Sequence, residues 1–336
     1  MCVAASRHYG GKQLAKLETA PAESIPYGRN TSVGIFLGID GGGTKTSCLI
    51  GDETSVLGSG TAAGSNVVRL GEAKAREALA AAIGQACAAA NIKPAQIERT
   101  CVGLAGAGRP EISNLVRRLL AELVPGEIEV LGDMVIALQA AFGSGAGVMV
   151  IAGTGSMAYG RDASGKTLRA GGWGFSIFDE GSGHWIGRSA IAAIMRDYDE
   201  TGEENSVLMN SVKKSWRLAT REQLILAANA FPSPDFAALL PAVLSAADSG
   251  DAIAQSILTQ AGTELARLAK IVIRRLFPDG DKVPVAMSGG VFSNCALVRQ
   301  VFYNSLRSEY PNCPVNSTMV EAVRGALELA RKGARV

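Results

Sequence analysis

Two glycine-rich turns contain the residues best suited to bind a charged ligand. The first is Gly41-Gly42-Gly43-Thr44-Lys45, and the second is Gly153-Thr154-Gly155-Ser156. Glycines lack a Cβ atom, so backbone N–H groups in such turns can surround an anion at close range. The threonine hydroxyls add donors, and Lys45 adds a positive charge. This chemistry fits a phosphate group, although neither turn has the spacing GxxxxGK[ST] or GxGxxG of the standard nucleotide-binding loops.

Each turn belongs to a repeated unit of three predicted strands. The copies cover residues 32–60 and 148–172, and each reads as strand, glycine-rich turn, strand, polar turn and strand. One glycine-rich turn is equally well explained as a tight hairpin, because glycine is a common turn residue. Two matching copies, one in each half of the chain, favour two related lobes that hold a phosphate-rich ligand between them.

Two aspartates follow predicted strands at positions where a carboxylate could do chemistry. Asp40 ends the first strand beside the glycines, where its charge would repel phosphate unless a cation intervened. Mg²⁺ suits this place because it binds through one or two carboxylates together with water and phosphate; the alternative is an aspartate that caps the turn. Asp133 ends a strand and begins a helix. It is either a helix N-cap or a general base that takes a proton from a substrate hydroxyl.

Three further segments could line a ligand site. The acidic pair Asp179 and Glu180 could bind sugar hydroxyls, and the tryptophan of the preceding segment Gly171–Phe175 could pack on a sugar ring. A surface loop with a buried tryptophan is the alternative. Asn66 is equally ambiguous, because asparagine is ordinary in loops. The turn Ser288-Gly289-Gly290 lies between a strand and a helix, where the missing side chains would admit a flat adenine and the helix dipole would favour phosphate.

Composition fits an α/β protein with two domains. The chain has 336 residues, of which 47% are hydrophobic and 19% are charged, and its formal net charge is +2. Residues 1–32 hold four basic and two acidic residues, so the rest is formally neutral, which argues against nucleic-acid binding. No apolar stretch reaches the roughly 18 residues of a membrane span, and the start lacks the apolar core of a signal peptide. We therefore expect a cytoplasmic protein.

The cysteine and histidine content argues against a structural metal site. The six cysteines contain no CxxC pair, and the chain has two histidines. A zinc site or a disulfide framework is therefore not expected.

Periodicity predicts the elements that position these residues. Residues 1–32 form either a disordered tail or the product of a wrongly chosen start codon. The first lobe, residues 33–134, reads as three strands followed by helix 72–90, strand 99–106, helix 109–123 and strand 127–131, with helix 134–142 beginning at its end. The order βββαβαβα is the core of an RNase H-like lobe. The second lobe, residues 135–318, carries an insertion of about a hundred residues after its repeat. Its predicted elements are helices near 185–198, 221–230, 235–247 and 251–277, strand 283–287 and a helix near 294–309, with a last helix near 322–332.

Together these segments resemble the sugar kinase, Hsp70 and actin superfamily, and within it the BadF/BadG/BcrA/BcrD ATPase family. The segments are GIDGGGTKT, GLAGAG, LGD, IAGTGS, GGWGFSIFDEGSGHWIG and MSGGVFSN. The resemblance runs from about Gly34 to the C-terminus. The GGWG…DEGS…WIG block is the most specific, since it separates this group from hexokinases, actin and Hsp70. Within the family the chain is most similar to the N-acetylglucosamine kinases.

The resemblance implies a fold and a set of site residues. The fold is α/β, with two RNase H-like (actin-like ATPase) lobes, a nucleotide cleft between them, a helical insertion in the second lobe and a C-terminal helix, residues 319–333, that returns to the first. The expected ligands are ATP, Mg²⁺ bound at Asp40 directly or through water, and a small amino sugar. The implied ATP contacts are Gly41, Gly42, Gly43, Thr44, Lys45, Thr154, Gly155, Ala247, Gly289, Gly290 and Asn294. The implied sugar contacts are Asn66, Asp133, Gly172, Trp173, Gly174, Phe175 and Asp179.

The resemblance also implies an activity. Asp133 would deprotonate the C6 hydroxyl of N-acetylglucosamine for attack on the γ-phosphate of ATP. Met157 stands where the animal enzymes carry asparagine, so glucosamine and N-acetylmuramic acid stay open as acceptors. An alternative of another class is an ATPase that activates a partner enzyme such as a 2-hydroxyacyl-CoA dehydratase. No nucleic-acid or membrane partner is expected, and a homodimer is compatible with the sequence.

Overall fold

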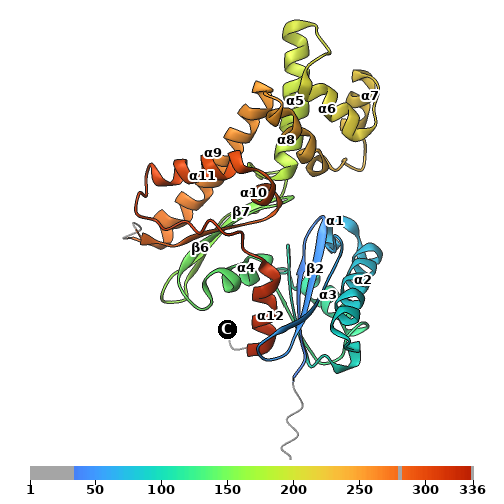
Figure 1. The fold of residues 1–336 in the computed structure, drawn as a ribbon, viewed down its shortest axis with the longest axis vertical. Coiled ribbons are helices and arrows are strands. Elements are labelled where there is room, and N and C mark those ends of the chain that lie inside the picture. The colour runs from blue at the N-terminus through green and yellow to red at the C-terminus, as the bar shows by residue number, and fades with distance from the viewer. Residues whose placement is uncertain (1–33, 279–281, 334–336) are drawn as a thin grey trace, which may run out of the picture. The chain divides into compact units, whose positions relative to one another are not determined.

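The two glycine-rich turns each connect the first two strands of a separate β-sheet. The computed structural model describes residues 34–278 and 282–333, and these belong to one structural unit (Figure 1). The interpretations of residues 1–32 lie outside the described residues. The sheets have the strand orders β3-β2-β1-β4-β5 and β8-β7-β6-β9, so the predicted α/β architecture with a repeated strand pattern is confirmed.

The first sheet places the carboxyl ends of three strands at one edge. Strand β1 pairs in parallel with β4, and β4 pairs in parallel with β5, whereas β1, β2 and β3 form an antiparallel meander. β1 is apolar and buried on both faces, as expected of a strand covered by helices on both sides. The bounds are β1 Phe36–Gly41, β2 Lys45–Gly51, β3 Val56–Ala63, β4 Arg99–Leu104 and β5 Glu127–Leu131.

Small residues let helix α2 (Glu72–Ala90) pack closely on β3. A Cβ atom on Gly60 would lie 2.1 Å from the Ala82 carbonyl oxygen, so only glycine fits at this crossing. The neighbouring elements are α1 Val67–Leu70, η1 Pro94–Gln96 and α3 Pro110–Ala121. The alanine-rich composition of α2 thus serves close helix–sheet packing.

The second sheet repeats the first without a full fifth strand. β6 pairs antiparallel with β7 and in parallel with β9, and a single parallel bridge between Val285 and Val315 stands where a fifth strand would lie. The bounds are β6 Gly147–Ala152, β7 Ser156–Arg161, β8 Thr167–Gly171 and β9 Val285–Ser288. The long helix α9 (Ala252–Leu276) packs on β6, β7 and β8 and covers this sheet.

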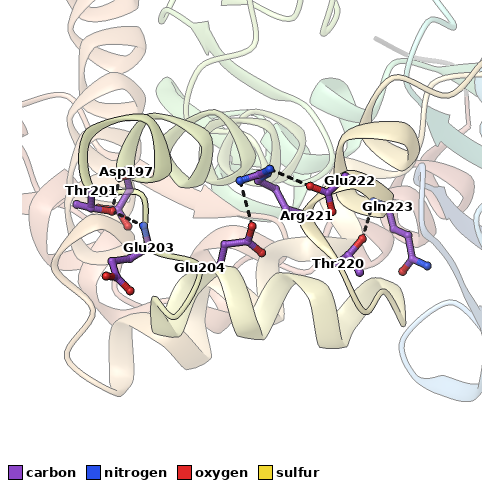
Figure 2. A network of polar contacts seen from close by, with 8 residues as sticks. All are labelled: Asp197, Thr201, Glu203, Glu204, Thr220, Arg221, Glu222 and Gln223. Carbon is purple, nitrogen blue, oxygen red and sulfur yellow. Dashed lines mark hydrogen bonds and ion pairs between the residues drawn. The ribbon is translucent and has the colours of Figure 1, made fainter.

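A helical insertion follows β8, and a polar network joins its parts. The guanidinium of Arg221 forms ion pairs of 3.0 Å with Glu204 and 2.8 Å with Glu222 (Figure 2). It also lies 3.6 Å from the centroid of the Tyr198 ring. These contacts tie the end of α5 to the start of α7. The insertion comprises α5 Gly183–Thr201, α6 Val207–Trp216, α7 Arg221–Ala228, η2 Phe236–Leu239 and α8 Leu240–Asp248.

Three α-helices were not predicted from the sequence: α1, α6 and α10 (Gly290–Asn294). Helix α6 begins where the Ser206 hydroxyl accepts a hydrogen bond from the Met209 N–H at 3.2 Å. The helix predicted near 294–309 is confirmed as α11 (Ala296–Arg307), and the short helix α10 precedes it. Cys295 separates them because its backbone is extended and its Sγ accepts a hydrogen bond from the Val298 N–H, as a helix N-cap does.

Helices α4 (Asp133–Phe142) and α12 (Ala322–Lys332) connect the two sheets. α12 packs on α4, β1 and β4, and α4 also contacts β6. One buried cluster contains Phe36 and Cys101 from the first sheet, Met149 and Ala286 from the second, and apolar residues of α12. Figure 1 shows α12 beside α4 and the first sheet. The end of the chain therefore packs beside strands that lie almost three hundred residues earlier.

The close approach of α12 to α4 depends on Gly325. A Cβ atom there would lie 1.9 Å from the Ile136 carbonyl oxygen, which is backbone and cannot rotate away. We expect Gly325→Ala to lower the free energy of unfolding by about 3 kcal/mol, as measured by urea titration. Gly84 is the control, because its Cβ would meet no atom within 4 Å; Gly84→Ala should raise stability by about 0.5–1 kcal/mol. Equal effects at both positions would contradict this account of the α4–α12 packing.

Among the described residues, no single helix is both long and apolar enough to cross a membrane. The bent pair Phe236–Asp248 and Ala252–Leu276 passes such a test only jointly, on length and composition. The apolar side chains of this pair belong to the buried core around the second sheet.

Candidate active site

Asp40 and Asp133 lie at the same edge of the first sheet. Asp40 is near the end of β1, and Asp133 follows the end of β5 and begins α4. Burial raises the pKa of Asp40 to about 7; the negative charge of Asp133 adds to this rise, and the positive charge of Lys45 opposes it. The two carboxylates are therefore close enough to repel each other.

Asp133 is the first residue of helix α4, and its carboxylate interacts with the start of that helix. The N-cap of α4 is Gly132, so the N-cap interpretation of Asp133 is wrong. Its Oδ1 accepts a hydrogen bond from the Met134 N–H at 2.9 Å. Burial raises the pKa of Asp133, whereas hydrogen bonds from its own N–H and that of Met134 lower it. A carboxylate whose pKa moves toward neutrality is a stronger base at neutral pH.

Backbone hydrogen bonds and the segment after β3 fix the first glycine-rich turn. The Gly42 N–H donates to the Lys45 carbonyl at 2.9 Å, and the Ser65 N–H donates to the Gly42 carbonyl at 3.1 Å. A Cβ atom on Gly41 would lie 2.8 Å from the Ser65 hydroxyl, so the chain after β3 packs directly against the turn. Thr44 and Lys45 are exposed and available to a ligand.

The second glycine-rich turn rests on the segment that follows β8. The buried carboxylate of Asp179 accepts a hydrogen bond from the Ser156 N–H at 2.7 Å, and the Ser156 hydroxyl donates to the Glu180 carbonyl at 2.7 Å. Burial raises the pKa of Asp179, and hydrogen bonds from the Ser156 N–H and the Ser182 side chain oppose the rise. Asp179 thus supports the second glycine-rich turn; its sugar contact stays a prediction.

The first turn of helix α5 also supports the second glycine-rich turn. The Gly183 N–H donates to the Gly153 carbonyl at 2.8 Å, and the His184 N–H donates to the Thr154 carbonyl at 3.2 Å. The positive end of the helix dipole therefore lies behind this turn, which favours negative charge near it.

The two glycine-rich turns meet. A Cβ atom on Gly43 would lie 3.2 Å from the Thr154 hydroxyl, although the two residues belong to different sheets and are more than a hundred positions apart. A phosphate held by the backbone of either turn would therefore be within reach of the other.

The predicted sugar contacts differ in what they offer a ligand. The Asn66 Oδ1 caps α1, where it accepts hydrogen bonds from the N–H groups of Val68 and Arg69 at 3.0 and 3.3 Å. Its amide nitrogen is then the group that could donate a hydrogen bond to a sugar hydroxyl. Trp173 is 59% exposed, so the alternative of a buried tryptophan is wrong. The Arg169 guanidinium lies over its ring, 4.4 Å from the centroid. The segment Gly172–Phe175 is exposed, so its backbone and rings are accessible to a sugar.

The predicted adenosine contacts lie beside the second glycine-rich turn. Gly289 has φ +101°, and a Cβ atom there would lie 2.4 Å from the Ala152 carbonyl oxygen. The Asn294 Nδ2 donates to the Gly290 carbonyl at 2.8 Å, which closes the turn into α10.

The buried residue Ala247 lies on α8. Burial raises the pKa of the Cys295 thiol and the charge of Asp248 adds to the rise, so the end of α8 lies near the α10–α11 junction. Ala247 and Asn294 thus belong to one neighbourhood.

One part of the site was missed by the sequence analysis. A cavity of about 550 Å³ opens beside the first glycine-rich turn, and its lining includes Gly43, Thr44, Arg69, Lys74 and Asp235. Arg69 of α1 forms an ion pair of 2.7 Å with Asp235, which precedes η2 in the insertion. No motif marks either residue, because the pair forms only when segments far apart in the sequence come together.

The residues present fit a magnesium ion that is shared with phosphate. The described ranges, 34–278 and 282–333, contain no group of three or more His, Cys, Asp or Glu side chains able to hold a metal ion by themselves. A nearby cation stabilises the ionised form of a half-buried carboxylate that its neighbour repels. Mg²⁺ normally takes one or two carboxylates, with water and phosphate as its other ligands. Asp40 satisfies that requirement.

Comparison with known proteins identifies relatives over most of the chain. The model of the BadF/BadG/BcrA/BcrD ATPase family matches residues 37–330. An N-acetylmuramic acid/N-acetylglucosamine kinase from Clostridium acetobutylicum is 32% identical over 299 residues, which are 88% of this chain and 97% of the relative. An N-acetyl-D-glucosamine kinase from Dictyostelium discoideum is 30% identical, with the same two coverages.

Solved structures share the fold. A protein from Chromobacterium violaceum, provisionally named an N-acetylglucosamine kinase, superposes with a TM-score of 0.69 at 25% identity and covers 89% of this chain and 99% of its own. A ROK family glucokinase from Streptomyces griseus, solved with glucose and AMPPNP, has a TM-score of 0.57 at 19% identity and covers 89% of this chain and all of its own. These likenesses confirm the predicted fold class.

Proposed function

Because the chain belongs to the BadF/BadG/BcrA/BcrD ATPase family, we propose that it is an ATP-dependent kinase that phosphorylates O6 of N-acetylglucosamine. The observation that carries the proposal is the pair Asp40 and Asp133, two mutually repelling carboxylates at the sheet edge from which the first glycine-rich turn extends. Relatives with 30% and 32% identity that are named as kinases of this sugar support the choice of acceptor.

In the proposed reaction Asp133 accepts the proton of the C6 hydroxyl. The oxygen then forms a bond to the γ-phosphorus of ATP, and the bond from that phosphorus to the β–γ bridging oxygen breaks, so that its electron pair leaves with ADP. Mg²⁺ at Asp40 would neutralise charge on the phosphates when bound. The contribution of the chain is mostly positioning and charge stabilisation, as is usual in phosphoryl transfer.

The other predicted residues take supporting roles in this proposal. Gly41–Lys45, Thr154 and Gly155 bind the phosphates, and Ala247, Gly289, Gly290 and Asn294 surround the adenosine. Asn66, Gly172–Phe175 and Asp179 line the sugar pocket. The buried carboxylate of Asp179 has a second role in this scheme, because it fixes the turn that carries Thr154.

ADP release tests the proposed function. We expect N-acetylglucosamine to raise ADP release from ATP and Mg²⁺ at least tenfold over the rate without sugar, because water is a poor substitute for a positioned hydroxyl. Glucosamine, N-acetylmuramic acid and glucose are offered separately. Stronger stimulation by N-acetylmuramic acid would show that this sugar is the preferred acceptor. The name of the Clostridium relative includes both sugars. ADP release at the same rate with and without each sugar would overturn the kinase proposal and favour the partner-activating ATPase. The cytoplasmic location and the homodimer stay predictions.

A further inference from the structure

Arg69 lies at the junction of the two glycine-rich turns. The position that a Gly43 Cβ atom would take is 3.4 Å from Arg69 Nη1 and 3.2 Å from the Thr154 hydroxyl. Arg69 Nη1 and the Thr154 hydroxyl therefore approach the same side of Gly43. The two turns come together at this place, so a phosphate bound by one turn would also contact the other turn.

The ion pair with Asp235 fixes the orientation of Arg69. The bond uses Nη2, at 2.7 Å from the Asp235 carboxylate, and leaves Nη1 directed at Gly43. Since a guanidinium has five N–H donors in a rigid plane, a carboxylate on one side leaves donors for an anion on the other. The side chains are 28% and 44% exposed, and an ion pair of this exposure adds little stability. Its main effect is to hold the guanidinium in place.

The surroundings of Arg69 favour an anion. Burial lowers the pKa of His184, the positive charges of Arg69 and Arg188 lower it further, and the negative charge of Asp235 opposes the shift. Both guanidinium groups therefore act on the first turn of α5. That helix end also points its positive dipole at the second glycine-rich turn. A phosphoryl group at the junction would therefore meet positive charge from the first lobe and from the second.

We propose that Arg69 is a further catalytic residue, whose guanidinium contacts the phosphoryl group during transfer while Asp235 acts as its positioning residue. The inference rests on the proposed function, since a phosphoryl group must pass the junction for the contact to form. Arg69 undergoes no covalent change and exchanges no proton. Its fixed positive charge stabilises the charge that develops on the phosphoryl oxygens as the bond to ADP breaks.

Steady-state kinetics separate this role from a merely structural link. We expect Arg69→Ala to lower kcat about 100-fold while the KM for N-acetylglucosamine changes less than about threefold. Arg69→Lys keeps a charge but loses the planar donors and should lower kcat about tenfold. Asp235→Asn should lower kcat about fivefold, because the guanidinium stays but is less well held. The control is Arg76→Ala, since Arg76 of α2 pairs with Glu122 at a more exposed site and should leave kcat unchanged.

Nucleotide binding measured by calorimetry provides a test that needs no sugar. In Arg69→Ala we expect the affinity for AMPPNP to fall about tenfold and the affinity for ADP to stay within about twofold of wild type, because the contact is to the γ-phosphoryl group alone. Equal losses for both nucleotides, or a kcat within threefold of wild type, would overturn the inference. A wild type that no sugar stimulates would refute the proposed function instead, and the nucleotide comparison would still decide the contact. If Arg69→Ala does not fold, the same comparison is made with Arg69→Lys.

Discussion

Replacing Asp133 with asparagine should lower kcat by about 1,000-fold or more, because the amide cannot take the proton of the sugar hydroxyl. The exchange preserves the shape of the side chain and an oxygen that can accept the hydrogen bond from the Met134 N–H. Binding of AMPPNP, measured by calorimetry, should stay within about twofold of wild type, since a general base does not hold the nucleotide. A fall in kcat with unchanged nucleotide affinity is the expected combination.

The pH profile adds an independent reading of the same group. Because burial raises the pKa of Asp133, kcat/KM for the sugar should fall as pH is lowered through that raised pKa and level off above it. The control substitution is Asp199→Asn, on the exposed face of α5, which should change neither kcat nor the profile. If Asp133→Asn retains more than a tenth of wild-type activity, another group is the base.

Asp40→Asn should have two effects of opposite sign. It should lower kcat about 100-fold or more, since a carboxylate ligand of Mg²⁺ becomes a neutral amide. It should also make the ligand-free protein more stable above pH 7. The reason is that burial and the charge of Asp133 raise the pKa of Asp40 from 3.8 to about 7, so folding disfavours its ionised form.

The sign of the stability effect follows from proton linkage. Between pH 4 and 7 the folded protein binds more protons at Asp40 than the unfolded chain does, so wild-type stability falls as pH rises through this range. The difference between 3.8 and about 7 corresponds to at most about 4 kcal/mol. Because Asp40 is partly exposed to water, we expect Asp40→Asn to gain about 1–3 kcal/mol above pH 7 and nothing below pH 4.

Urea titrations of wild type and Asp40→Asn at several pH values, without Mg²⁺ or nucleotide, measure this effect. Asp52 is a control of opposite sign, since hydrogen bonds from Ser55 and Thr54 lower its pKa. Asp52→Asn should therefore lower stability at neutral pH. A destabilised Asp40→Asn protein would mean that its carboxylate stabilises the fold, and the magnesium proposal would lose its physical basis.

The types of most elements follow from local sequence. The predicted ranges of α2 and β5 coincide with the observed bounds, since α2 is rich in alanine and β5 is followed directly by Gly132 and Asp133. Helix α6 was missed because its ten residues lie in a polar, charged part of the insertion. Its buried apolar residues are explained only by their packing against α8. The separation of α10 from α11 at Cys295 was not predicted because a cysteine as a helix N-cap has no strong sequence signal.

Some residues of the candidate site were predicted from the sequence, and others were found only in the structure. Sequence alone identified the two glycine-rich turns and the two aspartates, because the turns occur in two matching copies and each aspartate lies at the end of a predicted strand. It did not identify Arg69 and Asp235, nor the support that Asp179 gives to Ser156, since these contacts join residues 166 and 23 positions apart. Arginine and aspartate on short helices and loops are common, and their meaning depends on what lies opposite.

Sequence by itself therefore determined the chemical groups available to this protein: two glycine-rich turns, two carboxylates and an α/β framework to hold them. Tertiary structure decided how these groups act on one another. Three features arise from distances across the fold: the burial and the repulsion that raise the pKa of Asp40, the contact between Gly43 and Thr154, and the orientation of Arg69. Electrostatic and steric interactions depend on distance in space, which residue order alone does not specify.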